Sequence, residues 1–224
     1  MSIVFKTTTN IEDAAGFVAS SVLNQLKLGK KVLLFLTGGS SISVGVKIAD
    51  ILKEQSAENL LQNLVVTLTD ERYGPTDSPD SNWHQLLEKG FNLPGVKLLP
   101  ILNGEDKNTT VEKFNAKLNE EFTKAEYKIG LFGIGRDGHT AGILPESLAV
   151  SAETLAFGYD TATFSRITIT FNAIEKLDEA IVWAQGKDKW KVLEELQTEI
   201  NFIKQPAQVL KKVSLLTIFS DFNN

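Results

Sequence analysis

The sequence is organised around one stretch, Gly133-Ile134-Gly135-Arg136-Asp137-Gly138-His139-Thr140-Ala141. It follows an apolar run, Ile129 to Ile134, which is typical of a buried strand. Three glycines within six residues allow the backbone to turn tightly and to approach a ligand closely. The turn also contains an arginine, an aspartate and one of the two histidines in the chain. In α/β proteins, a glycine-rich turn that carries ionisable groups after a strand is a common place for a ligand site.

Predicted strands and helices alternate along the rest of the chain. Short apolar runs indicate strands that are buried on both faces, as in a parallel sheet covered by helices on each side. These runs are residues 32–36, 64–69, 129–134, 180–184 and 213–219. Apolar residues at helical spacing predict helices between them, the first preceded by the N-cap residue Asn10 and ended by Gly29. The alternation, without a linker or internal repeat, predicts one doubly wound α/β domain over residues 1–224.

Some segments are less regular. Asp70-Glu71-Arg72 places ionisable groups at the end of the strand 64–69, on the ligand-binding edge of the sheet, although a solvated turn is an alternative interpretation. Residues 148–163 show no clear pattern and predict a loop on the surface. Residues 166–170 alternate and are β-branched, so they predict a strand with one more polar face. His84 lies in a short predicted helix, where a lone histidine is more often a surface or packing residue.

A second glycine-containing turn follows the strand 32–36. Thr37-Gly38-Gly39-Ser40-Ser41 leads directly into a predicted helix. The start of a helix offers free amide N–H groups and the positive end of the helix dipole, and this arrangement binds phosphate well. The turn is therefore a candidate phosphate site, and an ordinary connection capped by a serine is the alternative interpretation.

The composition excludes several classes of protein. No apolar run approaches the roughly 20 residues of a membrane helix, and Met1 to Lys6 lack the apolar core of a signal peptide, so we expect a cytoplasmic protein without membrane contact. A net charge of −5 argues against nucleic-acid binding, which normally needs a basic face. The absence of cysteine excludes disulfides, thiolate nucleophiles and zinc–sulfur sites.

The glycine turn matches the dinucleotide-binding fingerprint as Gly133-x-Gly135-x-x-Gly138, with Glu153 about 20 residues further on. That motif should open a helix, yet Gly142 and Pro145 interrupt the residues that follow. Asp137 would also place a negative charge beside the pyrophosphate of the cofactor. The sequence therefore does not favour a nicotinamide cofactor.

Acid–base chemistry is the interpretation that the side chains of this turn favour. A histidine can act as a general base near neutral pH, because its unperturbed pKa is about 6.5. His139 is therefore the candidate base, and Asp137, close to it on the same turn, can orient the imidazole or stabilise its charged form. The sequence has no second histidine and no carboxylate cluster at ligand spacing, so it does not indicate a metal site.

The glycine turn strongly resembles the signature of the 6-phosphogluconolactonases, and other stretches fall in the order of that family. Thr37–Ser41 resembles its phosphate-binding turn. The rest resemble its second signature and its C-terminal substrate-binding positions: Asp70-Glu71-Arg72 with Ser81-Asn82, then Arg166-Ile167-Thr168 and Gly186-x-x-Lys189. The resemblance covers nearly the whole chain. It implies a three-layer α/β/α fold, similar to those of glucosamine-6-phosphate deaminases and ribose-5-phosphate isomerases.

The resemblance also implies an activity, the hydrolysis of 6-phosphoglucono-δ-lactone to 6-phosphogluconate in the oxidative pentose phosphate pathway. His139, assisted by Asp137, would activate the attacking water, and Arg72 would hold the phosphate or the developing charge. The residues implied for the phosphate site are Arg166 and Lys189 with Gly38, Gly39, Ser40 and Ser41. Because a lactone is an activated ester, neither a metal nor a cofactor is implied, and the partner is a small-molecule sugar phosphate lactone.

The sequence departs from the family pattern at two places, and two other functions are alternatives to the lactonase. The family usually has threonine–proline where this chain has Ser41-Ile42, and residues 160–165 replace its proline-rich approach to the arginine strand. A glucosamine-6-phosphate deaminase, the nearest sugar-phosphate isomerase alternative, would normally have tyrosine at Arg72 and isoleucine at Thr140. A non-catalytic sugar-phosphate sensor should have lost the general base, yet His139 is present. The lactonase is therefore favoured, and the sequence leaves the oligomeric state open.

Overall fold

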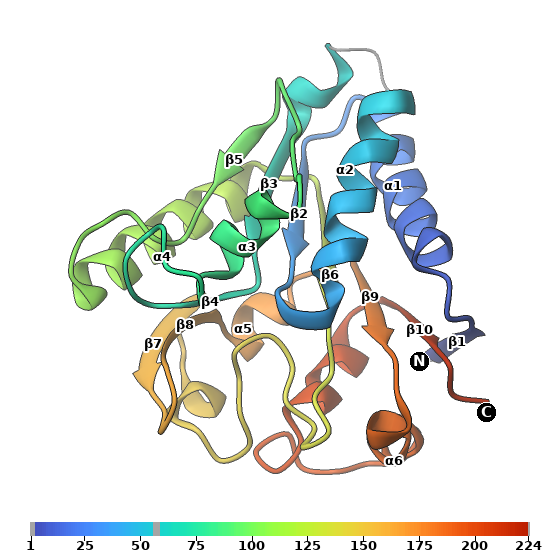
Figure 1. Cartoon of the computed structure of the whole chain (residues 1–224), viewed down its shortest axis with the longest axis vertical. Helices are drawn as coiled ribbons and strands as arrows, with labels where there is room; N and C mark the ends of the chain where they lie inside the picture. The colour runs from blue at the N-terminus through green and yellow to red at the C-terminus, as the bar shows by residue number, and fades with distance from the viewer. Residues whose placement is uncertain (1–2, 56–58, 224) are drawn as a thin grey trace.

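A parallel sheet runs through the middle of the molecule in the computed structural model, which describes residues 3–55 and 59–223 (Figure 1). Its strand order is β1-β10-β9-β6-β2-β3-β5, and every neighbouring pair is parallel. The strands are β1 (Ile3–Thr7), β2 (Val32–Leu36), β3 (Leu64–Leu68), β5 (Lys97–Leu99), β6 (Tyr127–Phe132), β9 (Glu179–Ala184) and β10 (Leu215–Ser220). β1 was not predicted, and Met1 and Ser2, which precede it, lie outside the described residues.

Helices cover both faces of this sheet. α1 and α2 pack against each other on one side of the strands, and α4 lies on the other side (Figure 1). This explains why all five residues of β2 are buried. The helices are α1 (Ile11–Lys27), α2 (Ile42–Gln55), α3 (Asn82–Glu88), α4 (Lys107–Lys124), α5 (Phe171–Ile174) and α6 (Trp190–Glu195), with 3₁₀ turns at Gly39–Ser41, Leu60–Asn63, Leu148–Ser151, Lys187–Lys189 and Pro206–Lys212. The predicted three-layer α/β/α fold with a mostly parallel sheet is confirmed.

Local sequence signals fix the helix ends. The side chain of Asn10 accepts the N–H of Glu12 at the start of α1 (3.1 Å), and Gly29, with φ of +78°, follows its end. At the start of α3, Ser81 caps the helix by accepting a backbone N–H through its hydroxyl. None of the helices in the described part of the chain is long and apolar enough to cross a bilayer.

A second sheet, antiparallel and smaller, has the order β4-β8-β7 and was not predicted. Its strands are β4 (Asp70–Arg72), β8 (Ser165–Ile169) and β7 (Ala156–Asp160). The prediction of a surface loop over residues 148–163 is therefore wrong, because β7 lies within it. The sequence of β7 hides the strand because Gly158 interrupts it. Gly158 lies against α4, where a Cβ would be 2.6 Å from the side chain of Val111.

Thr69 joins the two sheets. Its N–H donates to the carbonyl of Leu36 at the end of β2 (2.7 Å), and its carbonyl accepts the N–H of Ile169 at the end of β8 (2.8 Å). β3 therefore ends at Leu68, and the chain continues directly into β4 of the second sheet. Asp70-Glu71-Arg72, expected at the edge of the parallel sheet, thus lies at that edge as a strand of its own.

The strand order reverses between β2 and β6. From β2 the sheet continues through β3 and β5 in one direction, and through β6, β9 and β10 in the other. In open α/β sheets, ligands bind outside the carboxyl ends of the strands at this reversal. The two glycine turns that follow β2 and β6 therefore meet at the place where a ligand site is expected.

Candidate active site

The turn after β6 is closed by backbone hydrogen bonds. The N–H of Gly135 donates to the carbonyl of His139 (3.0 Å), and the N–H of Gly138 donates to the carbonyl of Gly135 (2.9 Å). Gly138 has φ of +81°, in the region that favours glycine. A Cβ on Gly135 would lie 2.1 Å from Nδ1 of His139. The glycines therefore make room for the imidazole of the turn itself, and this fixes where the imidazole lies.

Asp137 and His139 form a hydrogen-bonded pair within this turn. Nδ1 of His139 lies 2.6 Å from Oδ1 of Asp137, which also accepts the backbone N–H of His139 (3.2 Å). The hydrogen bond from the imidazole lowers the pKa of Asp137 to about 2, so the carboxylate is ionised at neutral pH. A carboxylate only accepts hydrogen bonds, so Nδ1 carries the proton and Nε2 of the neutral imidazole is left as the acceptor.

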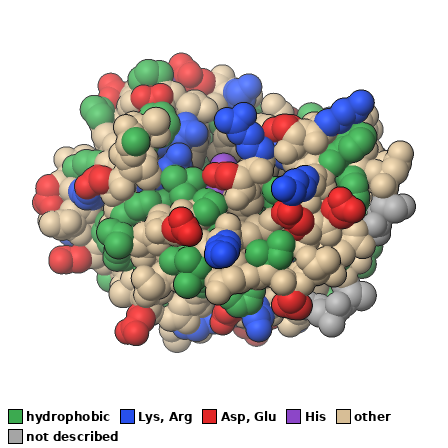
Figure 2. All heavy atoms as spheres, turned by 90° about the horizontal axis from the view of Figure 1, so that it is seen from below, with side chains coloured by type: hydrophobic (Ala, Val, Ile, Leu, Met, Phe, Trp, Pro, Cys, Tyr) green, Lys and Arg blue, Asp and Glu red, His purple; other side chains and the backbone are tan. Residues whose placement is uncertain are grey.

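His139 faces a cleft of about 300 Å³. Figure 2 shows the carboxyl-edge side of the molecule, with a histidine in a hollow and lysine or arginine side chains near it. The cleft is lined by Thr37, Gly38, Gly39, Ser40, Ser41, Asp70, Arg72, Asn82, Gly133, Ile134, Gly135, His139, Ala141, Arg166 and Lys189. The structure thus brings together every residue predicted for the site except Asp137, which reaches the cleft only through His139. The roles of these residues remain predictions.

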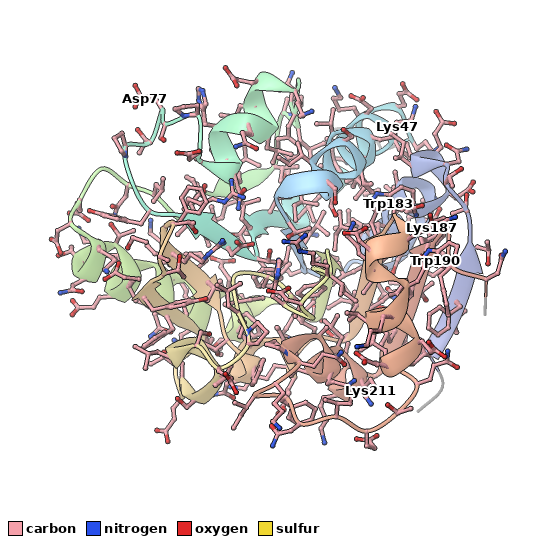
Figure 3. All side chains as sticks on the ribbon, turned by 60° about the horizontal axis from the view of Figure 1, so that its bottom comes forward. Lys47, Asp77, Trp183, Lys187, Trp190 and Lys211 are labelled. Carbon is pink, nitrogen blue, oxygen red and sulfur yellow. The ribbon has the colours of Figure 1, made fainter. Side chains whose placement is uncertain are left out.

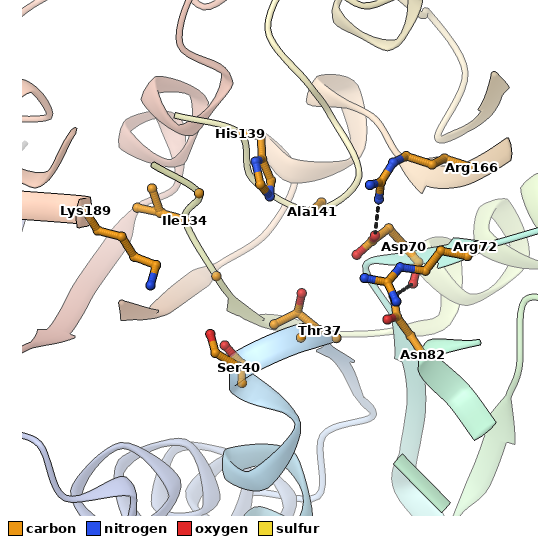
Figure 4. Close-up of a pocket in the computed structure, with 15 residues that line it drawn as sticks. Thr37, Ser40, Asp70, Arg72, Asn82, Ile134, His139, Ala141, Arg166 and Lys189 are labelled. Atoms are coloured by element: carbon orange, nitrogen blue, oxygen red, sulfur yellow. Dashed lines mark hydrogen bonds and ion pairs between the residues drawn. The ribbon is translucent and has the colours of Figure 1, made fainter. Parts of the chain in front are cut away.

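The turn after β2 lies across the cleft from His139 (Figure 4). Gly39 to Ser41 form a 3₁₀ turn that continues into α2, and Gly39 has φ of +63°. The first N–H groups of a helix have no partner within the helix. Ser41 is fully buried, and its hydroxyl has no hydrogen-bond partner among the described residues. Free amides and an unpaired hydroxyl suit an anionic group.

Two arginines form a further wall of the cleft. Arg72 of β4 and Arg166 of β8 are directly opposite in the antiparallel register, where like charges repel. Within the described residues, their one ion-pair partner is Asp70, whose Oδ2 lies 3.7 Å from Nη1 of Arg166. The Nε atoms of both arginines are buried and have no partner in the described part of the chain. Excess positive charge with unused donors is typical of a site for an anion.

Lys189 reaches the cleft from the side opposite to the arginines, with the glycine–serine turn between them (Figure 4). Its Nζ donates to the carbonyl of Gln185 (2.5 Å). The neighbouring Trp190 is held by Asp221, whose Oδ1 accepts the indole N–H (3.1 Å). Figure 3 shows Lys187 beside Trp190, and Nζ of Lys187 lies 5.5 Å from the ring centroid. Lys189 thus belongs to a packed turn.

Asn82 and Ala141 line the cleft but were not predicted to do so. The amide of Asn82 donates to the carbonyl of Asp70 (3.0 Å), and its Oδ1 would lie 2.1 Å from a Cβ on Gly38. Ala141 has φ of +49°, a conformation that is costly outside glycine and clusters at functional sites. For both residues the only sequence signal was their place in a stretch that resembles the family, Asn82 in the second signature and Ala141 at the end of the glycine turn.

Glu71, which the sequence left without a role, supports the cleft from behind. It is fully buried, and its Oε1 accepts the N–H groups of Arg72 (2.7 Å) and Asn82 (2.6 Å). Its Oε2 accepts the N–H of Trp83 (2.9 Å) and the hydroxyl of Ser81 (3.0 Å). Burial raises the pKa of Glu71, and the three amide hydrogen bonds oppose that rise. The carboxyl group therefore ties β4 to the first turn of α3.

His84 and Arg136 lie outside the cleft. His84 is on α3, where its Nε2 lies 3.4 Å from the carboxylate of Glu88, in agreement with a surface role. Arg136 is exposed and does not line the cleft, although the turn that carries it does. Across residues 3–55 and 59–223, no group of three histidine, aspartate or glutamate side chains is placed to hold a metal ion.

The fold and the cleft define an α/β protein whose cleft, at the reversal point of its sheet, is lined by two arginines, a lysine and a glycine–serine turn. This chain belongs to the family described as glucosamine-6-phosphate isomerases/6-phosphogluconolactonase, whose model matches residues 6–218.

The names of individual proteins that are similar to this chain agree with this family assignment. A 6-phosphogluconolactonase of Haemophilus influenzae is 27% identical over 209 residues, which cover 88% of this chain and 85% of that protein. The structure of a 6-phosphogluconolactonase from Shewanella baltica is similar with a TM-score of 0.81 and 21% identity, over 98% of each chain. That of the Thermotoga maritima 6-phosphogluconolactonase has a TM-score of 0.78 and 21% identity, over 98% of this chain and 99% of that one. These structures share the fold of this chain.

Proposed function

We propose that this protein hydrolyses 6-phosphoglucono-δ-lactone to 6-phosphogluconate in the oxidative pentose phosphate pathway. The observation that carries the proposal is the His139–Asp137 pair, which faces a cleft whose other walls present two arginines and a glycine–serine turn. Membership of the family and the names of its relatives support the same reaction.

The geometry of the pair supports the role of general base for His139. Nε2 of His139 accepts a proton from a water molecule as that water attacks the lactone carbonyl carbon. Asp137 stays ionised and stabilises the imidazolium that results. When the bond between the carbonyl carbon and the ring oxygen breaks, His139 returns the proton to the departing oxygen. The product is a hydroxy acid, and no covalent enzyme intermediate is formed.

The phosphate of the substrate lies over the glycine–serine turn in this proposal. Arg166 and Lys189 approach that turn from two sides, so both can contact a dianion placed on the amides of Gly39 to Ser41. Arg72, opposite Arg166, contributes to the same positive wall. Charge-assisted hydrogen bonds of this kind are roughly twice as strong as neutral ones.

A coupled assay tests the reaction. Glucose-6-phosphate dehydrogenase generates the lactone, and its decay is followed with and without this protein. We expect the protein to accelerate decay well beyond the spontaneous rate and to leave glucosamine-6-phosphate unchanged. Decay at the spontaneous rate in the presence of folded protein would refute the proposal, and release of ammonia from glucosamine-6-phosphate would support the deaminase instead.

Loss of Arg166 or Lys189 should weaken the preference for a phosphorylated substrate. Each charge-assisted contact is worth about 1.5–3 kcal/mol, so Arg166→Ala and Lys189→Ala should each lower kcat/KM for the phosphorylated lactone roughly 10- to 100-fold. The rate with plain glucono-δ-lactone should change far less. Lys187→Ala is the matched control, because Lys187 contacts Trp190 and does not line the cleft. An unchanged ratio of kcat/KM for the two lactones would show that these cations do not bind the phosphate.

The activity should survive removal of divalent ions. The chain has two histidines and no cysteine, and the proposed mechanism assigns the proton transfer to His139. After dialysis against EDTA, we expect the coupled assay to give an unchanged rate. A rate that falls on dialysis and returns with added Mg²⁺ or Zn²⁺ would contradict the metal-free mechanism.

A further inference from the structure

The ring of Phe164 contacts both arginines of the cleft. Its centroid lies 5.1 Å from Cζ of Arg72 and 5.6 Å from Cζ of Arg166. Both distances are within the range of about 6 Å over which a guanidinium is attracted to an aromatic ring. One ring therefore interacts with two cations that come from different strands of the second sheet.

The two arginines need a contact that keeps them close together. They are directly opposite in the register of β4 and β8, and their charges repel. Asp70 is too far from Arg166, at 3.7 Å, for a normal hydrogen bond. Arg72 donates one hydrogen bond to the carbonyl of Asp80 (3.0 Å). These contacts leave a net positive pair, of which the Arg166 side chain is only 15% exposed.

An aromatic ring holds a guanidinium in a way that a carboxylate does not. A carboxylate would neutralise the positive charge and occupy N–H donors, whereas the face of a ring attracts the cation and takes up no donor. The buried Nε atoms of Arg72 and Arg166 indeed have no partner among the described residues. The ring thus holds the arginines in place without neutralising their charge or occupying their N–H groups.

The backbone of Phe164 is itself fixed by the turn between β7 and β8. Both the N–H and the hydroxyl of Thr161 donate to the carbonyl of Phe164 (2.8 Å each), and the hydroxyl also accepts the N–H of Phe164 (3.0 Å). This turn lies in residues 160–165, where the chain departs from the proline-rich pattern of its family. In this chain, the hydrogen bonds of Thr161 fix the segment that precedes β8, the strand that carries Arg166.

We propose that Phe164 is a positioning residue of the anion site, whose ring keeps the guanidinium groups of Arg72 and Arg166 together and available to the phosphate of the substrate. Phe164 does not line the cleft and acts only through the two arginines. The identity of the substrate rests on the proposed function, whereas the binding of a phosphate group does not.

Three variants test this role. Phe164→Leu removes the ring, and Phe164→Tyr keeps it. Phe157→Leu is the control, because Phe157 lies on the same hairpin and stacks on Tyr159. Calorimetric titration with 6-phosphogluconate and with inorganic phosphate measures anion binding, and the coupled assay measures KM and kcat.

For Phe164→Leu we expect roughly 3- to 30-fold weaker binding of both anions, the size of one or two cation–π contacts. KM for the phosphorylated lactone should rise by a similar factor, with kcat and the rate on plain glucono-δ-lactone within about twofold of wild type. Phe164→Tyr and Phe157→Leu should both stay within about twofold in every measurement. A general packing defect would lower kcat as well and would not be rescued by tyrosine.

Anion binding by Phe164→Leu at the affinity of wild type would overturn the proposal, and so would equal losses in the leucine and tyrosine variants. Wild-type protein that binds neither anion would overturn it too. If Phe164→Leu does not fold, Phe164→Met is used in its place, and the same results are expected. If neither variant folds, the ring is needed for the stability of the core, and the proposed positioning role is overturned. Phosphate binding that depends on the ring, without lactone hydrolysis, would refute the proposed function alone.

Discussion

Replacement of His139 by alanine is expected to lower kcat/KM for the lactone by about 10²–10⁴-fold, the usual contribution of a general base. The imidazole lines the cleft, its Nδ1 is occupied by Asp137, and its Nε2 is left to accept a proton. The side chain is 38% exposed and belongs to a turn, so its loss should leave the fold intact. The coupled assay measures the rate, and circular dichroism measures folding.

His84→Ala is the matched control for this experiment. It removes the other histidine of the chain, which lies on α3 beside Glu88 and outside the cleft. Its activity should stay within about twofold of wild type, because His84 does not line the cleft and surface substitutions usually change stability by less than about 0.5 kcal/mol. Activity of His139→Ala within a few-fold of wild type would exclude His139 as the base.

Asp137→Asn should lower kcat by about 10²-fold or more, with little change in KM. The amide can donate to Nδ1, which would leave the proton on Nε2, where it blocks the acceptance of a proton from water. Since the two residues act as one unit, the double variant with His139→Ala should be no slower than His139→Ala alone, within about threefold. Kinetics of the four proteins measure this, and additive losses would show that Asp137 acts independently.

The pKa of Asp137 also makes this pair pH-dependent in a defined direction. Its pKa falls from 3.8 to about 2 on folding, so the native carboxylate is stabilised. That stabilisation is fully present above the unfolded pKa and is lost as the pH falls toward 2. The difference in Tm between wild type and Asp137→Asn should therefore shrink between about pH 5 and pH 2. A difference that stays constant over this range would contradict the assignment.

Much of this fold could be predicted from local patterns. β2 is apolar at every position because helices cover both of its faces, and Asn10 and Gly29 delimit α1 through their own backbone and side-chain chemistry. Part of the candidate site could be predicted from the sequence for a related reason. The two glycine turns and Asp70-Glu71-Arg72 follow strands whose carboxyl ends meet, so strand order indicated that these stretches would converge. Arg166 and Lys189 were indicated only by the family resemblance.

The second sheet could not be predicted, because its strands depend on partners far away in the chain. β7 contains Gly158, which is unfavourable in a strand unless a neighbour approaches closely, and that neighbour is α4. β4 has three residues and pairs with a strand almost 100 residues later. The role of Glu71 was hidden in the same way, because its four donors come from the backbone and from Ser81.

Thr69 has a consequence for how the substrate binds, because it fixes two walls of the cleft relative to each other. It donates to β2 with its N–H and accepts from β8 with its carbonyl, so the arginine-bearing sheet is attached to the strand that leads into the glycine–serine turn. These two walls cannot separate without breaking a buried backbone hydrogen bond. This side of the cleft is therefore preorganised, so its main chain loses little entropy when the substrate binds, and the entropy cost comes mainly from the substrate.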